Sequence, residues 1–278
     1  MNDICDLHTH SVFSDGTDTP TQLIGEAERL GLSAIALTDH NTIGGLPEFL
    51  AAGENRQVKA IAGIEFSTEY QDIELHILAL GVQPQYFDSI TALMEDFRRR
   101  KEESNLALVE ALNKAGYSLD YQRIRETHIG YVNRAHIAAE LTQKGYTGSI
   151  QEAFRMLLSP GGGYYVPPKR LSSFEAIQFI KSIGAVSVLA HPFLNLTEPE
   201  LRFFLPQAVE SGLDAMETRY SRYDARTTVM ADSIADEFGL KHSGGSDYHG
   251  GNKPDIRLAA GEGNLRAPAS YARMMQLL

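Results

Sequence analysis

Short apolar runs recur along this chain of 278 residues, and most of them end at a polar residue or a glycine. Runs of this length that are rich in Leu and β-branched residues are typical of strands buried in a parallel sheet. Segments of helical periodicity lie between several of them, which predicts repeated β-α units, closed as a barrel or laid out as an open sheet. The runs are Ile4–Leu7, Ser33–Leu37, Ala60–Ile64, Ile73–Leu80, Ala185–Leu189, Leu213–Met216 and His242–Gly245.

The helical segments between the runs carry boundary signals. Pro20–Leu30 follows Thr19, which is a suitable N-cap residue, and it ends at Gly31. Ser173–Ile183 and Thr227–Phe238 take the same place between later runs. We therefore expect helices that pack against the sheet from outside.

The segment from residue 83 to residue 170 interrupts this alternation. Three helices are predicted in it, over Asp88–Ala115, Arg134–Lys144 and Ser149–Leu158. A glycine- and proline-rich turn follows them before the β-α pattern resumes. We expect residues 1–82 and 171–278 to form the core, and residues 83–170 to form a helical insertion that acts as a lid or substrate subdomain.

Composition excludes several classes of protein. The 25 basic and 36 acidic residues give a net charge of −11, which disfavours binding to long duplex nucleic acid. The one cysteine, Cys5, cannot form an internal disulfide. The first residues do not resemble a signal peptide, and no apolar run approaches the ~20 residues that span a bilayer. We therefore expect a cytoplasmic globular protein without a membrane partner.

The nine histidines are unevenly placed, since six of them fall at or near the ends of predicted strands. Three carboxylates share these positions. Because strand ends on one face of a β/α barrel converge on a single pocket, we expect these side chains to meet there. The residues are His8, His10, His40, His76, His191 and His249, with Asp15, Glu65 and Asp247.

Imidazoles and carboxylates that converge on one point need a counter-charge, which metal ions supply. Nitrogen and oxygen donors without a thiolate suit Mn, Fe or Zn, and nine ligands fit two or three ions. Three divalent ions against three carboxylates leave a local charge of about +3, so an acidic protein can hold one spot that attracts anions. Clustered metals favour hydrolysis, because they polarise phosphoryl oxygens and generate hydroxide at neutral pH.

Six motifs occur in order along the chain: DLHTHSVFSDGT, LTDHNTIGGLPE, GIEFS, ELHILALG, VLAHP and GGSDYHG. Together they resemble the polymerase and histidinol phosphatase (PHP) superfamily of metal-dependent phosphoesterases. The resemblance implies a distorted, TIM-like (β/α)7 barrel with a trinuclear centre of Mn²⁺, or alternatively Fe²⁺ or Zn²⁺. It further implies that the first metal is held by His8, His10, Glu65 and Asp247, the second by Asp15, His40 and His249, and the third by Glu65, His76 and His191.

The insertion is similar to the branch of that superfamily that acts on nucleotide phosphates. That branch includes nucleoside 3′,5′-bisphosphate phosphatases and a related 5′→3′ exoribonuclease of short RNA. A helix N-terminus is a ready phosphate site, and an arginine can hold phosphate through two hydrogen bonds. The expected substrate-binding residues are Asn133, Arg134, Lys169, Arg219 and Arg222. Tyr223 stands where many relatives carry a histidine or another polar group, and it is the candidate leaving-group acid.

The expected activity is release of the 3′-phosphate from nucleoside 3′,5′-bisphosphates, with trimming of short RNA from its 5′ end as a further activity. A hydroxide that bridges the metals would attack phosphorus, with Asp15, Glu65, His191 and Asp247 as the catalytic residues around it. One alternative is a histidinol-phosphate-type phosphatase for a small non-nucleotide monoester, and another is metal-dependent amide hydrolysis. A third is a non-catalytic regulatory PHP module, which the complete ligand set argues against.

Overall fold

The computed structural model describes residues 3–126, 132 and 134–278, and the chain forms two compact units. Unit 1 comprises Met1–Thr91 and Leu171–Leu278, and unit 2 comprises Ala92–Arg170. Asn133, one of the expected substrate-binding residues, lies outside the described residues.

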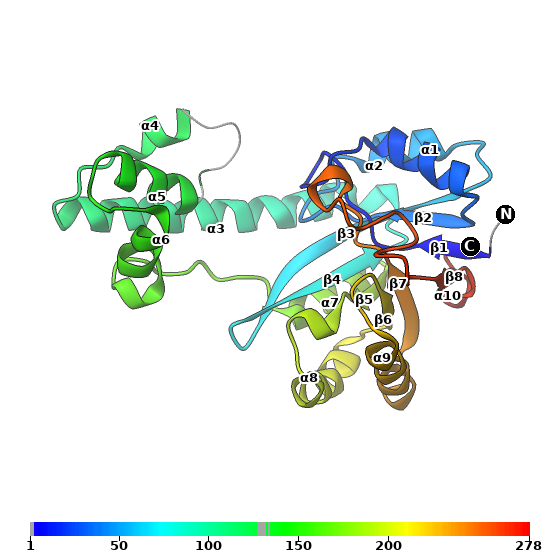
Figure 1. Ribbon diagram of the computed structural model, residues 1–278. Coiled ribbons are helices and arrows are strands. Elements are labelled where there is room, and N and C mark those ends of the chain that lie inside the picture. Colours follow the sequence, from blue (N-terminus) through cyan, green and yellow to red (C-terminus); the bar gives the residue numbers. More distant parts are fainter. Residues whose placement is uncertain (1–2, 127–131, 133) are drawn as a thin grey trace. The chain divides into compact units, whose positions relative to one another are not determined.

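Unit 1 is built on one sheet of eight strands in the order β7-β6-β5-β4-β3-β2-β1-β8 (Figure 1). Just beyond β1, the Leu7 N–H donates to the Gly244 carbonyl of β7 at 3.2 Å, and the His10 N–H donates to the Tyr248 carbonyl at 2.9 Å. These bonds bring the two sides of the sheet together as a nearly closed barrel, which confirms the α/β barrel expected from the sequence. The strands are β1 (Ile4–Asp6), β2 (Ala34–Leu37), β3 (Lys59–Tyr70), β4 (Ile73–Leu80), β5 (Val186–Leu189), β6 (Ala215–Tyr220), β7 (Lys241–Gly245) and β8 (Ala267–Pro268).

The prediction of parallel strands throughout is wrong for β4, which runs antiparallel to both β3 and β5. β3 and β4 form a hairpin, and the turn residues Gln71 and Asp72 have φ of 49° and 65°, as a two-residue hairpin turn requires. Because β3 pairs with β4 as far as Tyr70, it continues past Glu65. Glu65 and His76 therefore lie within strands rather than at strand ends. Apolar periodicity carries no information on strand direction, which is why the sequence did not reveal this.

Most helices of unit 1 pack outside the sheet (Figure 1). As predicted, Thr19 caps α1 and the helix ends at Gly31, whose φ is 71°. Thr19 and Gln22 also form a capping box. Among the described residues, no helix combines the length and apolar character needed to cross a bilayer. The helices are α1 (Pro20–Leu30), α2 (Leu46–Gly53), α7 (Ser173–Ser182), α8 (Glu198–Ser211), α9 (Ala225–Glu237) and α10 (Ser270–Met274).

One buried cluster takes residues from most strands of the barrel, as a shared interior requires. Small side chains predominate in it, and α10 adds Tyr271 and Ala272. The residues of the strands include Cys5, Ala34, Ala36, Leu78, Leu80, Val188 and Ala215, and Leu7 joins them from just beyond β1. This apolar packing fixes the strands that carry the polar cluster described below.

Unit 2 is helical and has a core of its own. Its helices are α3 (Phe87–Lys114), which begins in unit 1, α4 (Tyr121–Glu126), α5 (Arg134–Gln143) and α6 (Ile150–Ala153), followed by a π-helical turn at Phe154–Leu158. Leu108, Leu112, Ile137, Leu141 and Leu158 pack together in it. The role of this segment as a lid or substrate subdomain stays a prediction.

Candidate metal centre

The structure brings all nine expected metal ligands into four overlapping groups. Within each group, the nitrogen and oxygen atoms lie within 4.8 Å of one another. The segments that follow β1, β2, β5 and β7 supply most of these side chains, and the β3-β4 hairpin supplies two. The groups are His8, His10 and Asp247; His8, Glu65 and His191; His40, Glu65 and His76; and His10, Asp15, His40 and His249.

Four donor atoms surround one point deep in the cluster. His8 Nε2 and His10 Nε2 lie 3.1 and 3.2 Å from Glu65 Oε2, and they lie 3.7 and 3.2 Å from Asp247 Oδ1. In a tetrahedral site with metal-ligand bonds of ~2.1 Å, neighbouring donors are ~3.4 Å apart. The spacing of these four atoms therefore fits one metal ion.

Glu65 divides its two oxygens between different neighbours. Oε2 lies 3.0 Å from His40 Nδ1 as well as close to His8 and His10, whereas Oε1 lies 2.8 Å from His76 Nδ1 and 3.2 Å from His191 Nε2. A carboxylate in this position is suited to bridge two cations.

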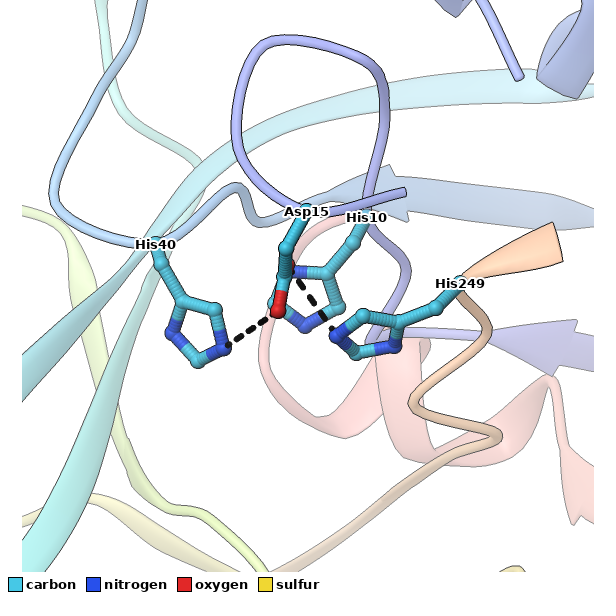
Figure 2. Close-up of side chains that lie close together, drawn as sticks. All are labelled: His10, Asp15, His40 and His249. Carbon is cyan, nitrogen blue, oxygen red and sulfur yellow. Dashed lines mark ion pairs between the residues drawn. The ribbon is translucent and has the colours of Figure 1, made fainter. Parts of the chain in front are cut away.

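The outer part of the cluster forms around Asp15 (Figure 2). Its carboxylate lies between the imidazoles of His10, His40 and His249, with nearest distances of 3.8, 3.9 and 3.2 Å. The Asp15 side chain is 55% exposed, while His10 and His249 are buried. This group therefore borders solvent, where a substrate can reach it.

Several buried atoms of the cluster lack hydrogen-bond partners, although other polar atoms lie close to them. Buried polar atoms in proteins are nearly always paired, so these unpaired atoms indicate a missing partner. Their short separations without hydrogen-bond geometry are consistent with atoms that surround shared cation positions. The atoms are His8 Nε2, His10 Nδ1 and Nε2, His40 Nδ1, Glu65 Oε2 and His249 Nε2. The donor set and these atoms fit divalent metal ions.

Electrostatics within the cluster oppose protonation of its carboxylates. Burial on its own raises the pKa of Glu65, but the imidazoles of His8, His40 and His76 hold this pKa well below its usual range. Burial on its own lowers the pKa of His76, but the carboxylates of Glu65 and Glu74 outweigh the effect of burial and raise this pKa to about 10. For His40, burial dominates and lowers the pKa to about 4. The cluster thus holds ionised carboxylates that attract cations.

Hydrogen bonds around the cluster fix the orientation of its imidazoles. Glu217 is fully buried, and it accepts from His8 Nδ1 at 3.0 Å and from the His191 backbone N–H at 2.6 Å. His249 Nδ1 lies 2.8 Å from the Asp247 carbonyl, to which it can donate. In both rings the second nitrogen, Nε2, then faces the cluster with its lone pair, as a metal ligand requires.

Backbone strain also concentrates at the cluster. His191 and Asp247 have φ of 28° and 55°, which residues other than glycine seldom adopt. Asp6 braces the second of these positions, because its carboxylate accepts from the Ser246 backbone N–H at 2.8 Å and from Ala259 at 2.7 Å. The fold therefore holds these ligands in orientations that the local chain disfavours.

The expectation that Arg219 binds phosphate stays a prediction, and the partner that the structure gives this side chain lies on α9. β6 has a bulge between Glu217 and Arg219, so the strict alternation of faces that the sequence suggests is broken. Arg219 turns instead to α9, where Nη1 donates to Asp232 at 2.6 Å.

The other expected substrate residues have varied surroundings. Arg134 Nη1 donates to the Leu158 carbonyl at 2.8 Å, and its guanidinium lies over the Tyr165 ring, so it packs inside unit 2. Lys169 is exposed in unit 2, and Arg222 is exposed in the loop after β6. The roles of these three residues in substrate binding stay predictions.

Tyr223 is buried, and its hydroxyl accepts from the Phe193 N–H at 3.1 Å. Burial raises the pKa of Tyr223 well above its ordinary range, which disfavours proton donation. The tyrosine that contacts the cluster is Tyr220, whose hydroxyl donates to Asp247 Oδ2 at 2.9 Å. The role of Tyr223 as the leaving-group acid stays a prediction.

Three residues next to the cluster were not singled out from the sequence: Glu217, Tyr220 and Lys253. Glu217 follows an apolar run, as several ligands do, and this signal could have identified it. Tyr220 reaches the cluster through the bulge in β6, and Lys253 reaches it from an irregular loop, so neither has a periodic signal.

A nearly closed barrel that gathers nine imidazoles and carboxylates at one site defines a metal-dependent hydrolase. A family model described as "PHP domain" matches residues 6–160. The chain belongs to the PHP domain family, and it is a phosphoesterase, as the sequence resemblance implied.

Relatives of similar identity carry different names. A 5′-3′ exoribonuclease of Haemophilus influenzae is 31% identical over 88% of this chain and 89% of its own length. A phosphoribosyl 1,2-cyclic phosphate 1,2-diphosphodiesterase of Eggerthella lenta is 32% identical over 88% and 94%. A 3′,5′-nucleoside bisphosphate phosphatase of Chromobacterium violaceum is 30% identical over 88% and 86%.

A solved structure supports the fold. It is described as a putative metal-dependent phosphoesterase of Bifidobacterium adolescentis. It aligns over 98% of this chain and 94% of its own, with a TM-score of 0.67 and 28% identity.

Proposed function

We propose that this phosphoesterase releases the 3′-phosphate from nucleoside 3′,5′-bisphosphates, using two or three divalent ions, with Mn²⁺ as the first choice and Fe²⁺ or Zn²⁺ as alternatives. The observation that supports metal dependence is the convergence of nine ligand residues, several of whose buried donor atoms have no hydrogen-bond partner. The similarity to the bisphosphate phosphatase of Chromobacterium violaceum supports the substrate. Similarity to the exoribonuclease favours a second activity, removal of nucleotides from the 5′ end of short RNA.

The proposed ligand sets are those that the sequence resemblance implies. His8, His10, Glu65 and Asp247 would hold one ion. Glu65 would also hold a second ion together with His76 and His191, and Asp15, His40 and His249 would hold a third. Bound there, divalent ions supply Lewis-acid stabilisation of phosphoryl oxygens and a nucleophilic water at neutral pH.

The side chains of this chain prepare that chemistry. Glu217 holds His8 so that Nε2 faces the cluster, and the Asp247 carbonyl does the same for His249. Burial of His8, His10 and Glu65 keeps bulk water from the deepest part of the site, while Asp15 lies where substrate enters. In this proposal, Asp15, Glu65, His191 and Asp247 surround the reacting phosphoryl group.

Two alternatives remain within the same chemistry. Similarity to the cyclic phosphate diphosphodiesterase of Eggerthella lenta favours a sugar cyclic phosphate as substrate. A histidinol-phosphate-type monoester is the other. All of these substrates present a phosphoryl group to one cluster, so they differ in what the rest of the substrate contacts.

The test couples metal analysis of the purified protein to phosphate release from a substrate panel. The panel contains adenosine 3′,5′-bisphosphate, AMP, histidinol phosphate, a ribose 1,2-cyclic phosphate and a 5′-phosphorylated RNA of a few nucleotides. We expect the bisphosphate to give the highest kcat/KM, and His8→Ala and Asp15→Asn to be inactive. Comparable rates on histidinol phosphate would refute the nucleotide assignment, and full turnover after metal stripping would refute the metal dependence.

A further inference from the structure

The two carboxylate oxygens of Asp247 face different partners. Oδ1 lies toward the cluster, 3.2 Å from His10 Nε2. Oδ2 accepts from the Tyr220 hydroxyl at 2.9 Å and from Lys253 Nζ at 2.8 Å. An ammonium group is therefore held one carboxylate away from the candidate metal centre.

Lys253 stands out among the cations of the described chain. Of the ion pairs found there, its pair with Asp247 is the only one that joins a lysine or arginine to Asp15, Glu65 or Asp247. An ammonium has three N–H donors, and among the described residues Asp247 is the one hydrogen-bond acceptor of Lys253. The Lys253 side chain is 33% exposed, so further donors are accessible to a ligand.

The loop that carries Lys253 is braced against the segment that carries Asp15. The Gly251 N–H donates to Thr17 Oγ1 at 2.8 Å, and Asn252 Nδ2 donates to the Asp15 carbonyl at 2.8 Å. In return, the Thr17 N–H donates to the His249 carbonyl at 3.2 Å. The position of the ammonium is thus coupled to the outer, solvent-facing part of the cluster.

We propose that Lys253 binds the phosphoryl group of the substrate directly, as the protein's own cation beside the metal centre; this inference rests on the proposed phosphatase function. Lysine is a common phosphate ligand that acts as a point charge. Arg219, another cation of the same barrel that was expected to bind phosphate, is paired with Asp232 on α9. Asp247 anchors one N–H of Lys253, and the remaining donors face the substrate.

A purely structural role makes the opposite prediction. If Lys253 only orients Asp247, its loss weakens metal binding and leaves phosphate binding at saturating metal unchanged. If Lys253 contacts phosphate, its loss weakens phosphate binding, while metal affinity does not fall, because a positive charge beside the cations has been removed.

The experiment measures two affinities on the full chain. Mn²⁺ binding is followed by calorimetry on metal-stripped protein, and inorganic phosphate binding by calorimetry on the Mn²⁺-loaded protein, with KM and kcat for the preferred monoester measured in parallel. The variants are Lys253→Met and Lys253→Arg. Tyr220→Phe removes the other donor to Asp247 without a change of charge, and Lys241→Met is a control for charge at the start of β7.

We expect Lys253→Met to weaken phosphate binding on the order of 10- to 100-fold, the loss typical of a charged hydrogen bond, with a matching rise in KM. Lys253→Arg should recover part of this loss, and Lys241→Met should behave as wild type. If Lys253→Met binds phosphate within twofold of the wild-type affinity, the inference about Lys253 is overturned, while the proposed function stands. Wild-type protein that binds Mn²⁺ but no phosphate would overturn the proposed function and this inference with it.

Discussion

Replacing Glu217 by glutamine tests whether the hydrogen bonds around the cluster set its metal affinity. Glu217 uses both oxygens, one for His8 Nδ1 and one for the His191 N–H. Glutamine offers one oxygen and one NH₂ group in their place. If the oxygen keeps the His191 N–H, the NH₂ group faces His8 Nδ1 and favours the tautomer that protonates Nε2.

That tautomer cannot bind a metal through Nε2, so His8 would lose its role as a ligand. In the reverse orientation, the NH₂ group opposes the His191 N–H, which leaves a buried donor unpaired. Either outcome costs about 1–3 kcal/mol, because the site is fully buried. Since ~1.4 kcal/mol corresponds to a tenfold change, we expect Mn²⁺ affinity to fall on the order of 10- to 100-fold.

The assay is calorimetric titration of metal-stripped protein with Mn²⁺, together with activity measured against Mn²⁺ concentration. Glu217→Gln should regain part of its activity at high Mn²⁺, because the remaining ligands are intact. Glu54→Gln, at the exposed end of α2, is the control for the same chemical change. An affinity for Glu217→Gln within twofold of wild type would show that the reasoning from tautomers is wrong.

Three further outcomes are expected. Metal affinity should rise with pH from about 6 to 9, because His76 must lose a proton before it can bind a metal. Burial on its own lowers the pKa of His76, but the neighbouring carboxylates outweigh burial and raise this pKa to about 10. Calorimetry in buffers of different ionisation enthalpy should show proton release, and a metal affinity that does not change with pH would contradict this prediction. Gly250→Ala should cost about 1–3 kcal/mol of unfolding free energy and weaken metal binding, because its φ is 61° and a Cβ would clash with Thr17 Oγ1. Gly184→Ala, with φ of 68° and no atom within 4 Å, should lose less stability and keep its metal affinity, and equal losses in urea unfolding would count against the braced loop. Arg219→Ala should change KM less than twofold and lower the free energy of unfolding by about 1 kcal/mol, because it removes the bond to Asp232 on α9. A tenfold rise in KM would instead support Arg219 as a phosphate ligand.

The sequence was most informative where candidate metal ligands directly follow a predicted strand. His8 and His10 follow β1, and Asp247 and His249 follow β7, so a local apolar run indicated where each pair lies. The helix Pro20–Leu30 was predicted with its observed bounds, because Thr19 and Gly31 are strong local signals.

What the sequence could not supply depends on contacts distant along the chain. The antiparallel direction of β4 follows from its pairing with β3 and β5, and no periodic pattern encodes it. The outward turn of Arg219 follows from a bulge that alternation cannot anticipate. Lys253 becomes interpretable only when its loop is seen beside Asp247.

The position of the metal centre also bears on how the barrel closes. Residues after β1 and residues after β7 meet through a few backbone bonds, including the Asp247 N–H to the His8 carbonyl at 2.9 Å. The same two segments supply His8, His10, Asp247 and His249, whose donor atoms surround shared points. A cation bound there would join the two segments by side chains as well as by backbone. Because a ligand that binds the native state alone stabilises it by about 2.7 kcal/mol at 100 times its Kd, metal loading should strengthen the closure of this barrel as well as enable hydrolysis.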